Sequence, residues 1–186
     1  NVHISLLTHA EPSGEPALRP GTSHNGMIAK SVKFLGRSAH AGGAPHLGIN
    51  ALNAANLAMQ GIALQRETFQ EEDKIRIHPI ITRGGAAVSS VPANVTMEMF
   101  IRSASIQGMK DAEIKVDQAL RAGAMAIGAT VEISTSPGYM PSKFCEELNQ
   151  TYDHAAVELV GQSGSGRMPH RTSSTDMGDV STIMPT

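Results

Sequence analysis

Cysteine and aromatic residues are scarce in this chain. Its single cysteine, Cys145, rules out an internal disulfide and a cysteine-rich zinc site, and it favours a reducing, cytoplasmic compartment. Tryptophan is absent and aromatic residues make up 3% of the sequence, so few surfaces are available for stacking nucleic-acid bases. The net charge of -2 gives no electrostatic reason to expect nucleic acid or an anionic membrane as a partner. No apolar run approaches the roughly twenty residues that span a bilayer. We therefore expect a cytoplasmic globular protein with neither partner.

Several catalytic motifs are also missing. The sequence has no Gly-x-Ser-x-Gly elbow of a serine hydrolase. The glycine-rich stretch from Gly161 to Gly166 is not followed by the Lys-Ser/Thr pair of a phosphate-binding loop. Cys145 precedes a predicted helix, but the neighbouring Phe144 and Leu148 favour a packed small hydrophobe over a reactive thiol.

The middle of the chain carries the most regular pattern. Period-two alternation predicts strands, and apolar residues at helical spacing predict helices. The predicted order is strand 28–35, helix 50–66, strand 74–82, strand 94–102, helix 107–127 and strand 130–134. This strand, helix, strand, strand, helix, strand order is the split βαβ, ferredoxin-like arrangement. The fold class is therefore predicted as α+β, with a four-stranded antiparallel sheet and two helices on one face.

Two less regular segments flank this middle part. Residues 1–26 contain an apolar strand candidate, Ile4 to His9, followed by a stretch rich in proline and glycine. Residues 138–186 contain one predicted helix, about 143–160. We interpret 27–137 as one domain, and the two flanks as incomplete parts of a second domain that the first interrupts.

A loop of small residues lies between the strand 28–35 and the helix 50–66. Residues 36–52 read GRSAHAGGAPHLGINAL and include His40 and His46. Imidazole is suited to proton transfer, oxyanion stabilisation or metal binding near neutral pH, and glycine lets a substrate approach closely. The loop is the first candidate for a functional site. The alternative is that each histidine has only a surface or capping role.

This seventeen-residue string resembles the signature of the dinuclear-zinc amidohydrolases and peptidases of family M20. The family includes aminoacylases, and the string is most similar to the branch with aminobenzoyl-glutamate hydrolases and other amidohydrolases. The resemblance implies a catalytic α/β domain interrupted by a ferredoxin-like lid that pairs with the lid of a second subunit. It also implies two zinc ions in the intact enzyme, with manganese or cobalt as alternatives. Most of the metal ligands and the catalytic glutamates would belong to a part of the enzyme missing from this chain, which by itself is expected to be inactive.

The same resemblance suggests individual site residues. His9, at the end of the apolar strand candidate, corresponds to a zinc-binding histidine, although Ala10 replaces the usual proline after it. His40 corresponds to the lid histidine that reaches the partner subunit's active site and stabilises the oxyanion there. His46 is a substrate-binding candidate, with a hydrogen bond at the start of the helix as the alternative. Asn50 is expected to cap that helix.

Three further substrate-binding candidates follow from the resemblance. Ser89 stands where many relatives carry an asparagine, Arg102 matches an arginine common at the end of that strand, and Asp176 lies in a segment that returns to the active-site floor. Ordinary turn chemistry is the alternative for Asp176, and a solvated or paired charge is the alternative for Arg102.

The sequence thus predicts part of a zinc-dependent amidohydrolase or metallopeptidase. Its substrate would be an N-acyl amino acid, an aminobenzoyl-glutamate-like compound or a dipeptide, and it would act as a homodimer. The competing interpretation is a non-catalytic, ferredoxin-like dimerisation or ligand-binding module, in which the His40 loop would be only a scaffold.

Overall fold

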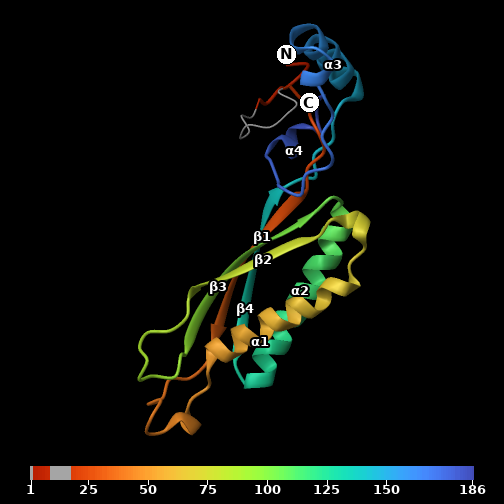
Figure 1. The fold of residues 1–186 in the computed structure, drawn as a ribbon. Helices are drawn as coiled ribbons and strands as arrows, with labels where there is room; N and C mark the ends of the chain where they lie inside the picture. The colour runs from red at the N-terminus through yellow and green to blue at the C-terminus, as the bar shows by residue number, and fades with distance from the viewer. Residues whose placement is uncertain (1, 9–17) are drawn as a thin grey trace.

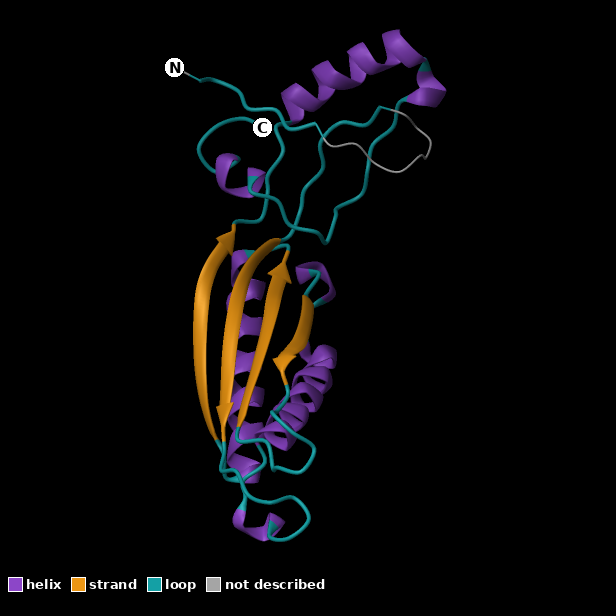
Figure 2. Ribbon diagram, turned by 90° about the vertical axis from the view of Figure 1, so that its left-hand side faces the viewer, coloured by secondary structure: helices purple, strands orange, loops and turns teal. Residues whose placement is uncertain are grey.

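A computed structural model describes residues 2–8 and 18–186. Its central part is an antiparallel sheet in the order β2-β3-β1-β4, covered on one face by two helices (Figures 1 and 2). The elements of this sheet and helix layer are β1 (Gly26–Leu35), α1 (Ala51–Leu64), β2 (Arg76–Arg83), β3 (Asn94–Ser103), α2 (Ile106–Ile127) and β4 (Thr130–Tyr139). The ferredoxin-like prediction is confirmed.

Short helices complete the secondary structure. The 3-10 helices are η1 (Pro45–Leu47), η2 (Gln65–Thr68), η3 (Glu71–Asp73) and η4 (Gln162–Gly164). The flanking part, which comprises residues 2–8, 18–25 and 140–186, carries α3 (Glu146–Val160) and α4 (Met177–Val180). It lies beyond one end of the sheet, where both chain termini are also found (Figure 1).

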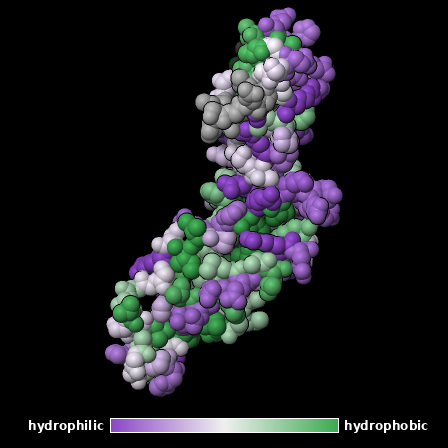
Figure 3. Space-filling view, viewed as in Figure 1, coloured by the Kyte–Doolittle hydropathy of each residue, from purple (hydrophilic) through white to green (hydrophobic). Residues whose placement is uncertain are grey.

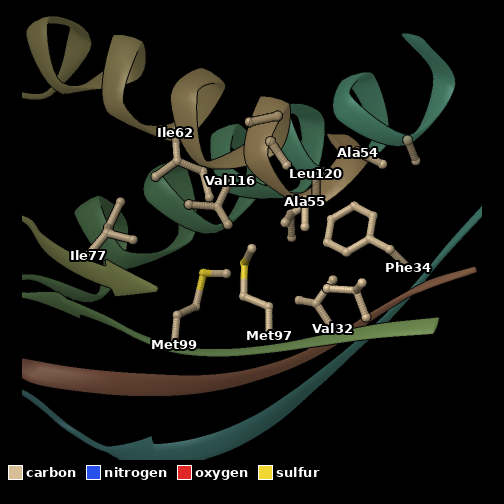
Figure 4. Close-up of a cluster of buried hydrophobic side chains, with 14 of the residues drawn as sticks. Val32, Phe34, Ala54, Ala55, Ile62, Ile77, Met97, Met99, Val116 and Leu120 are labelled. Carbon is tan, nitrogen blue, oxygen red and sulfur yellow. The ribbon is translucent and has the colours of Figure 1, made fainter. Parts of the chain in front are cut away.

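The core lies between the sheet and the two helices (Figure 4). Alternate residues of β3, namely Val95, Met97, Met99 and Ile101, point into it and are buried, as the period-two pattern predicts. Gly123 of α2 allows the helices to pack closely, because a Cβ there would lie 2.7 Å from the carbonyl oxygen of Ala54 in α1.

Lys30 is an exception to this apolar interior. Its side chain projects from β1 to the helix side and is 0% exposed. The ammonium lies 3.0 Å from Oε1 of Glu113 and 2.8 Å from Oδ1 of Asp117, both on α2. It also donates to the Thr135 hydroxyl at 2.7 Å. Opposite charges and hydrogen bonds therefore offset the free-energy cost of burying the ammonium.

Two details differ from the predictions. Strand β4 continues to Tyr139 because it pairs with β1 along nearly its whole length, and Pro137 is tolerated because β4 is an edge strand. Residues 2–8 form no strand. Within this segment Ser5 donates one backbone hydrogen bond, to the carbonyl of Pro185, and no neighbouring strand supplies a ladder in the described part of the chain.

Candidate functional site

The loop that carries His40 lies at the distal end of the sheet, where β1 ends and β3 begins (Figure 1). It pairs with the loop before β3 through backbone hydrogen bonds. Ala41 N–H donates to the Ser89 carbonyl at 2.8 Å, and Val91 N–H donates to the Ala39 carbonyl at 2.9 Å. His40 lies between these two bonds, so its backbone is held on both sides.

The His40 side chain is tied to its own loop. Its Nδ1 accepts hydrogen bonds from the backbone N–H groups of Gly42, at 3.2 Å, and Gly43, at 2.9 Å. The residue is exposed. The imidazole is thus held at one nitrogen on an accessible loop.

His46 and Ser89 lie at the same end. His46 belongs to η1 and is exposed. The predicted cap is Asn50, whose Oδ1 accepts from Leu52 and Asn53 N–H at the start of α1. Ser89 is exposed, and its carbonyl holds the His40 loop. The structure therefore groups His40, His46 and Ser89 on two paired loops.

Arg102 lies near the end of β3, at the opposite end of the sheet. We call this the junction end, because the flanking part lies beyond it (Figure 1). The guanidinium carbon of Arg102 lies 5.2 Å from the centre of the Phe100 ring. Its Nε is buried and has no hydrogen-bond partner among the described residues. Because β1 has ten residues, at about 3.3 Å per residue the two ends of the sheet are roughly 30 Å apart. Arg102 and His40 are not brought together within one chain.

The remaining candidates belong to the flanking part. Asp176 is exposed and precedes α4. The neighbouring Asp179 makes the more structural contact, since its Oδ1 accepts the Met140 N–H at 2.9 Å just after β4. His9, the predicted zinc ligand, lies outside the described residues.

A polar cluster around the buried Asn25 lies at the junction and is not predicted from the sequence. His170 Nδ1 lies 2.9 Å from the Ser23 hydroxyl, and its Nε2 lies 2.8 Å from Oδ1 of Asn25, a fully buried residue. Asn25 in turn donates to the Lys74 carbonyl at 2.9 Å. Burial lowers the pKa of His170, and the positive charge of Lys74 lowers it further. About 145 residues separate the two sides of this cluster, so no local sequence pattern could reveal it.

No metal site is complete in the part of the chain that the structure describes. Among residues 2–8 and 18–186, no group of three or more histidine, cysteine, aspartate or glutamate side chains could hold a metal ion. In the same residues no helix is both long and apolar enough to cross a membrane.

Comparison with known proteins agrees with this architecture. The family model for the M20 peptidase dimerisation domain matches residues 22–126. Xaa-Arg dipeptidase of Mus musculus is 28% identical over 98% of this chain, and one component of the p-aminobenzoyl-glutamate hydrolase of Escherichia coli K12 is 30% identical over 74% of it. The crystal structure of an aminobenzoyl-glutamate utilization protein from Klebsiella pneumoniae superposes on 95% of the chain and 44% of its own, with a TM-score of 0.67 at 21% identity.

The matched relatives are longer than this chain. The aligned region covers 42% of the mouse dipeptidase and 28% of the E. coli hydrolase component. The chain thus corresponds to only part of each of these proteins.

Proposed function

The chain belongs to the M20 peptidase dimerisation domain family, and from this premise we propose that residues 27–137 are the lid and dimerisation domain of a metal-dependent amidohydrolase or peptidase. Residues 1–26 and 138–186 would then border its catalytic domain. The names of the two relatives refer to a dipeptidase and an aminobenzoyl-glutamate hydrolase. They support a substrate with an amide bond beside a carboxylate: a dipeptide, an N-acyl amino acid or an aminobenzoyl-glutamate-like compound.

The position of His40 is the observation that carries this proposal. It is exposed on paired loops at the distal end of the sheet, roughly 30 Å from the junction end by the rise of a ten-residue strand. A side chain cannot cover that distance to its own flanking part. His40 is therefore suited to act in the active site of a second subunit.

In that site His40 would donate a hydrogen bond to the carbonyl oxygen of the scissile amide. Negative charge grows on this oxygen as the tetrahedral intermediate forms, and a preorganised donor stabilises the transition state most at that point. The guanidinium of Arg102, at the junction end, would bind a substrate carboxylate. His46, Ser89 and Asp176 would supply weaker substrate contacts.

The metal would be held mainly by residues outside this chain. The described residues do not fit a complete metal site, and we derive no catalytic step through a metal here. His9 is the one ligand that we propose from this sequence, for zinc or for manganese or cobalt in its place.

Dimerisation is supported by an open edge of the sheet. Strand β2 pairs only with β3 in the described sheet, so its outer backbone groups are free to pair with another strand. Ile80 on β2 is 60% exposed, and Leu64 at the end of α1 is 76% exposed. Hydrophobic side chains are also visible on the surface of the sheet and helix layer (Figure 3). We propose a homodimer in a cytoplasmic compartment, which the single cysteine favours.

The test uses the full-length protein and a panel of dipeptides, N-acyl amino acids and aminobenzoyl-glutamate, in the presence of zinc. We expect His40→Ala to lower kcat by about 100- to 1,000-fold, the usual cost of removing an oxyanion donor. His46→Ala is the matched control, because it changes a histidine of the same loop. It is expected to change kcat less than tenfold.

Subunit mixing tests whether His40 acts across the dimer. His40→Ala would be co-expressed with a variant that lacks the metal ligands of the catalytic domain. A random mixture contains heterodimers with one intact site, so about a quarter of wild-type activity should return. No recovery would contradict action in the partner subunit. Absence of hydrolysis on the whole panel by the wild-type protein would favour a non-catalytic binding module.

A further inference from the structure

The loop around His40 also constrains which nitrogen of its ring carries the proton. The backbone N–H groups of Gly42 and Gly43 both donate to Nδ1. A nitrogen that accepts a hydrogen bond must present its lone pair and cannot itself carry a proton. In the neutral imidazole, the single N–H is then on Nε2.

We propose that the Gly42 and Gly43 backbone selects the Nε2-protonated tautomer of the His40 imidazole, so that Nε2 carries the N–H that can donate to a substrate. This inference rests on the proposed function for the identity of the acceptor, the amide carbonyl oxygen. The lone pair of Nδ1 is occupied by the loop, and Nε2 carries the proton.

The two glycines lie beside the His40 ring. A Cβ on Gly43 would lie 3.4 Å from Nδ1 and 3.7 Å from Cγ of His40, and a Cβ on Gly42 would lie 3.6 Å from Cε1. These are ordinary van der Waals distances, so Gly42 and Gly43 act on the ring through their backbone N–H groups and not by leaving space for it. Gly42 and Gly43 are positioning residues, since they act on the substrate only through His40.

The rest of the loop keeps the ring in place. The His40 carbonyl accepts the Ala44 N–H at 2.9 Å, which closes the turn that contains both glycines. The bonds from Ala41 to Ser89 and from Val91 to Ala39 fix the backbone on either side of His40. A donor held in this way loses little further entropy when it meets the oxyanion, and preorganisation of this kind is what makes such donors effective.

Nuclear magnetic resonance of the present chain with ¹⁵N-labelled histidine tests the tautomer directly. At alkaline pH, long-range ¹H–¹⁵N spectra should show His40 with a protonated Nε2 and an unprotonated, hydrogen-bonded Nδ1. Gly43→Pro, which removes the backbone N–H of residue 43, should shift the His40 Nδ1 signal toward that of a free imidazole, while the signals of His46 stay unchanged. The Ala41 and Val91 amide signals show whether the paired loops remain folded in the variant. A proton on Nδ1, or a His40 signal that does not respond to Gly43→Pro in a folded loop, would overturn the proposal.

A second measurement uses kcat of the full-length enzyme. Glutamine places a neutral amide N–H near the position of Nε2, whereas alanine supplies no donor. We expect His40→Gln to retain about tenfold more activity than His40→Ala, a partial recovery of one oxyanion donor. Equal, low activities would overturn the donor role. Wild-type activity in both variants would refute the proposed function of His40, but the tautomer measurement would still decide the loop geometry independently.

Discussion

The two ends of the sheet are held in different ways. At the distal end, neighbouring loops are joined by backbone hydrogen bonds, such as the one from Ala41 to Ser89, and His40 is left exposed. At the junction end, side chains from distant segments meet around Asn25, which is 0% exposed. The distal end therefore presents the candidate side chain of His40 on hydrogen-bonded loops, and the junction end joins the sheet to the flanking part through side-chain contacts.

Lys30 lies between these ends, and its replacement should have the largest effect on stability. Lys30→Ala would remove the buried partner of Glu113 and Asp117 and leave a cavity. We expect a loss of about 3–5 kcal/mol in the free energy of unfolding, the usual cost of breaking a buried ion pair. Urea denaturation followed by circular dichroism measures it. Lys33→Ala, on the same strand but on the open face, is the control and should cost less than about 1 kcal/mol. Similar losses in both variants would show that the buried ion pairs add nothing.

Alanine substitutions at two glycines, one at each end of the sheet, allow the two ends to be compared directly. A Cβ on Gly36 would collide with the Ile49 carbonyl at the distal end, and one on Gly178 would collide with the Met140 carbonyl at the junction end. Each alanine variant should cost about 1–3 kcal/mol through overpacking. Because Gly36 adjoins β1, Gly36→Ala should lower the protection of sheet amides in hydrogen exchange. Gly178→Ala should affect only the flanking part.

The controls for this pair are Gly84→Ala and Gly21→Ala. In both, the nearest atom to the new Cβ is at ordinary contact distance, 3.7 Å and 3.6 Å respectively. They should leave hydrogen exchange nearly unchanged. Loss of sheet protection in Gly178→Ala would mean that the two ends unfold as one unit.

The smallest effect expected is a pH dependence confined to the junction end. The pKa of His170 is lowered from its ordinary value of 6.5 in the folded chain. As the pH falls through about 6.5, the unfolded or opened form therefore takes up a proton before the folded form does, and the junction loses stability. Above that pH both forms are neutral and no effect is expected.

Hydrogen exchange of the amides of Asn25 and Arg171, measured between pH 5 and 8 and corrected for intrinsic exchange, checks this. Their protection should decrease in acid, while the amides of Ala41 and Val91 at the distal end keep theirs. His170→Gln should remove this pH dependence. The control is His154→Gln, on the exposed side of α3, which should leave the pH dependence unchanged. An unchanged acid response in His170→Gln would assign the effect to another group.

Local sequence patterns were sufficient to predict the sheet and helix layer. Alternation in β1 and β3 and helical spacing in α1 and α2 are local patterns, and they were sufficient for the ferredoxin-like fold. The cap by Asn50 and the grouping of His40 with His46 were equally local. Strand β4 was predicted too short because its last residues, including Pro137, gain their strand form from pairing with β1 and carry no periodic signal.

The distribution of the candidate residues follows from tertiary packing. The tertiary structure places His40 and Arg102 at opposite ends of the sheet, and it joins His170 to Asn25 across the junction. It also shows that the Lys30 ammonium is buried against Glu113 and Asp117. The physical reason is sequence distance: these contacts form between segments far apart in the chain, so they depend on how strands and helices pack and leave no pattern in any short stretch of sequence.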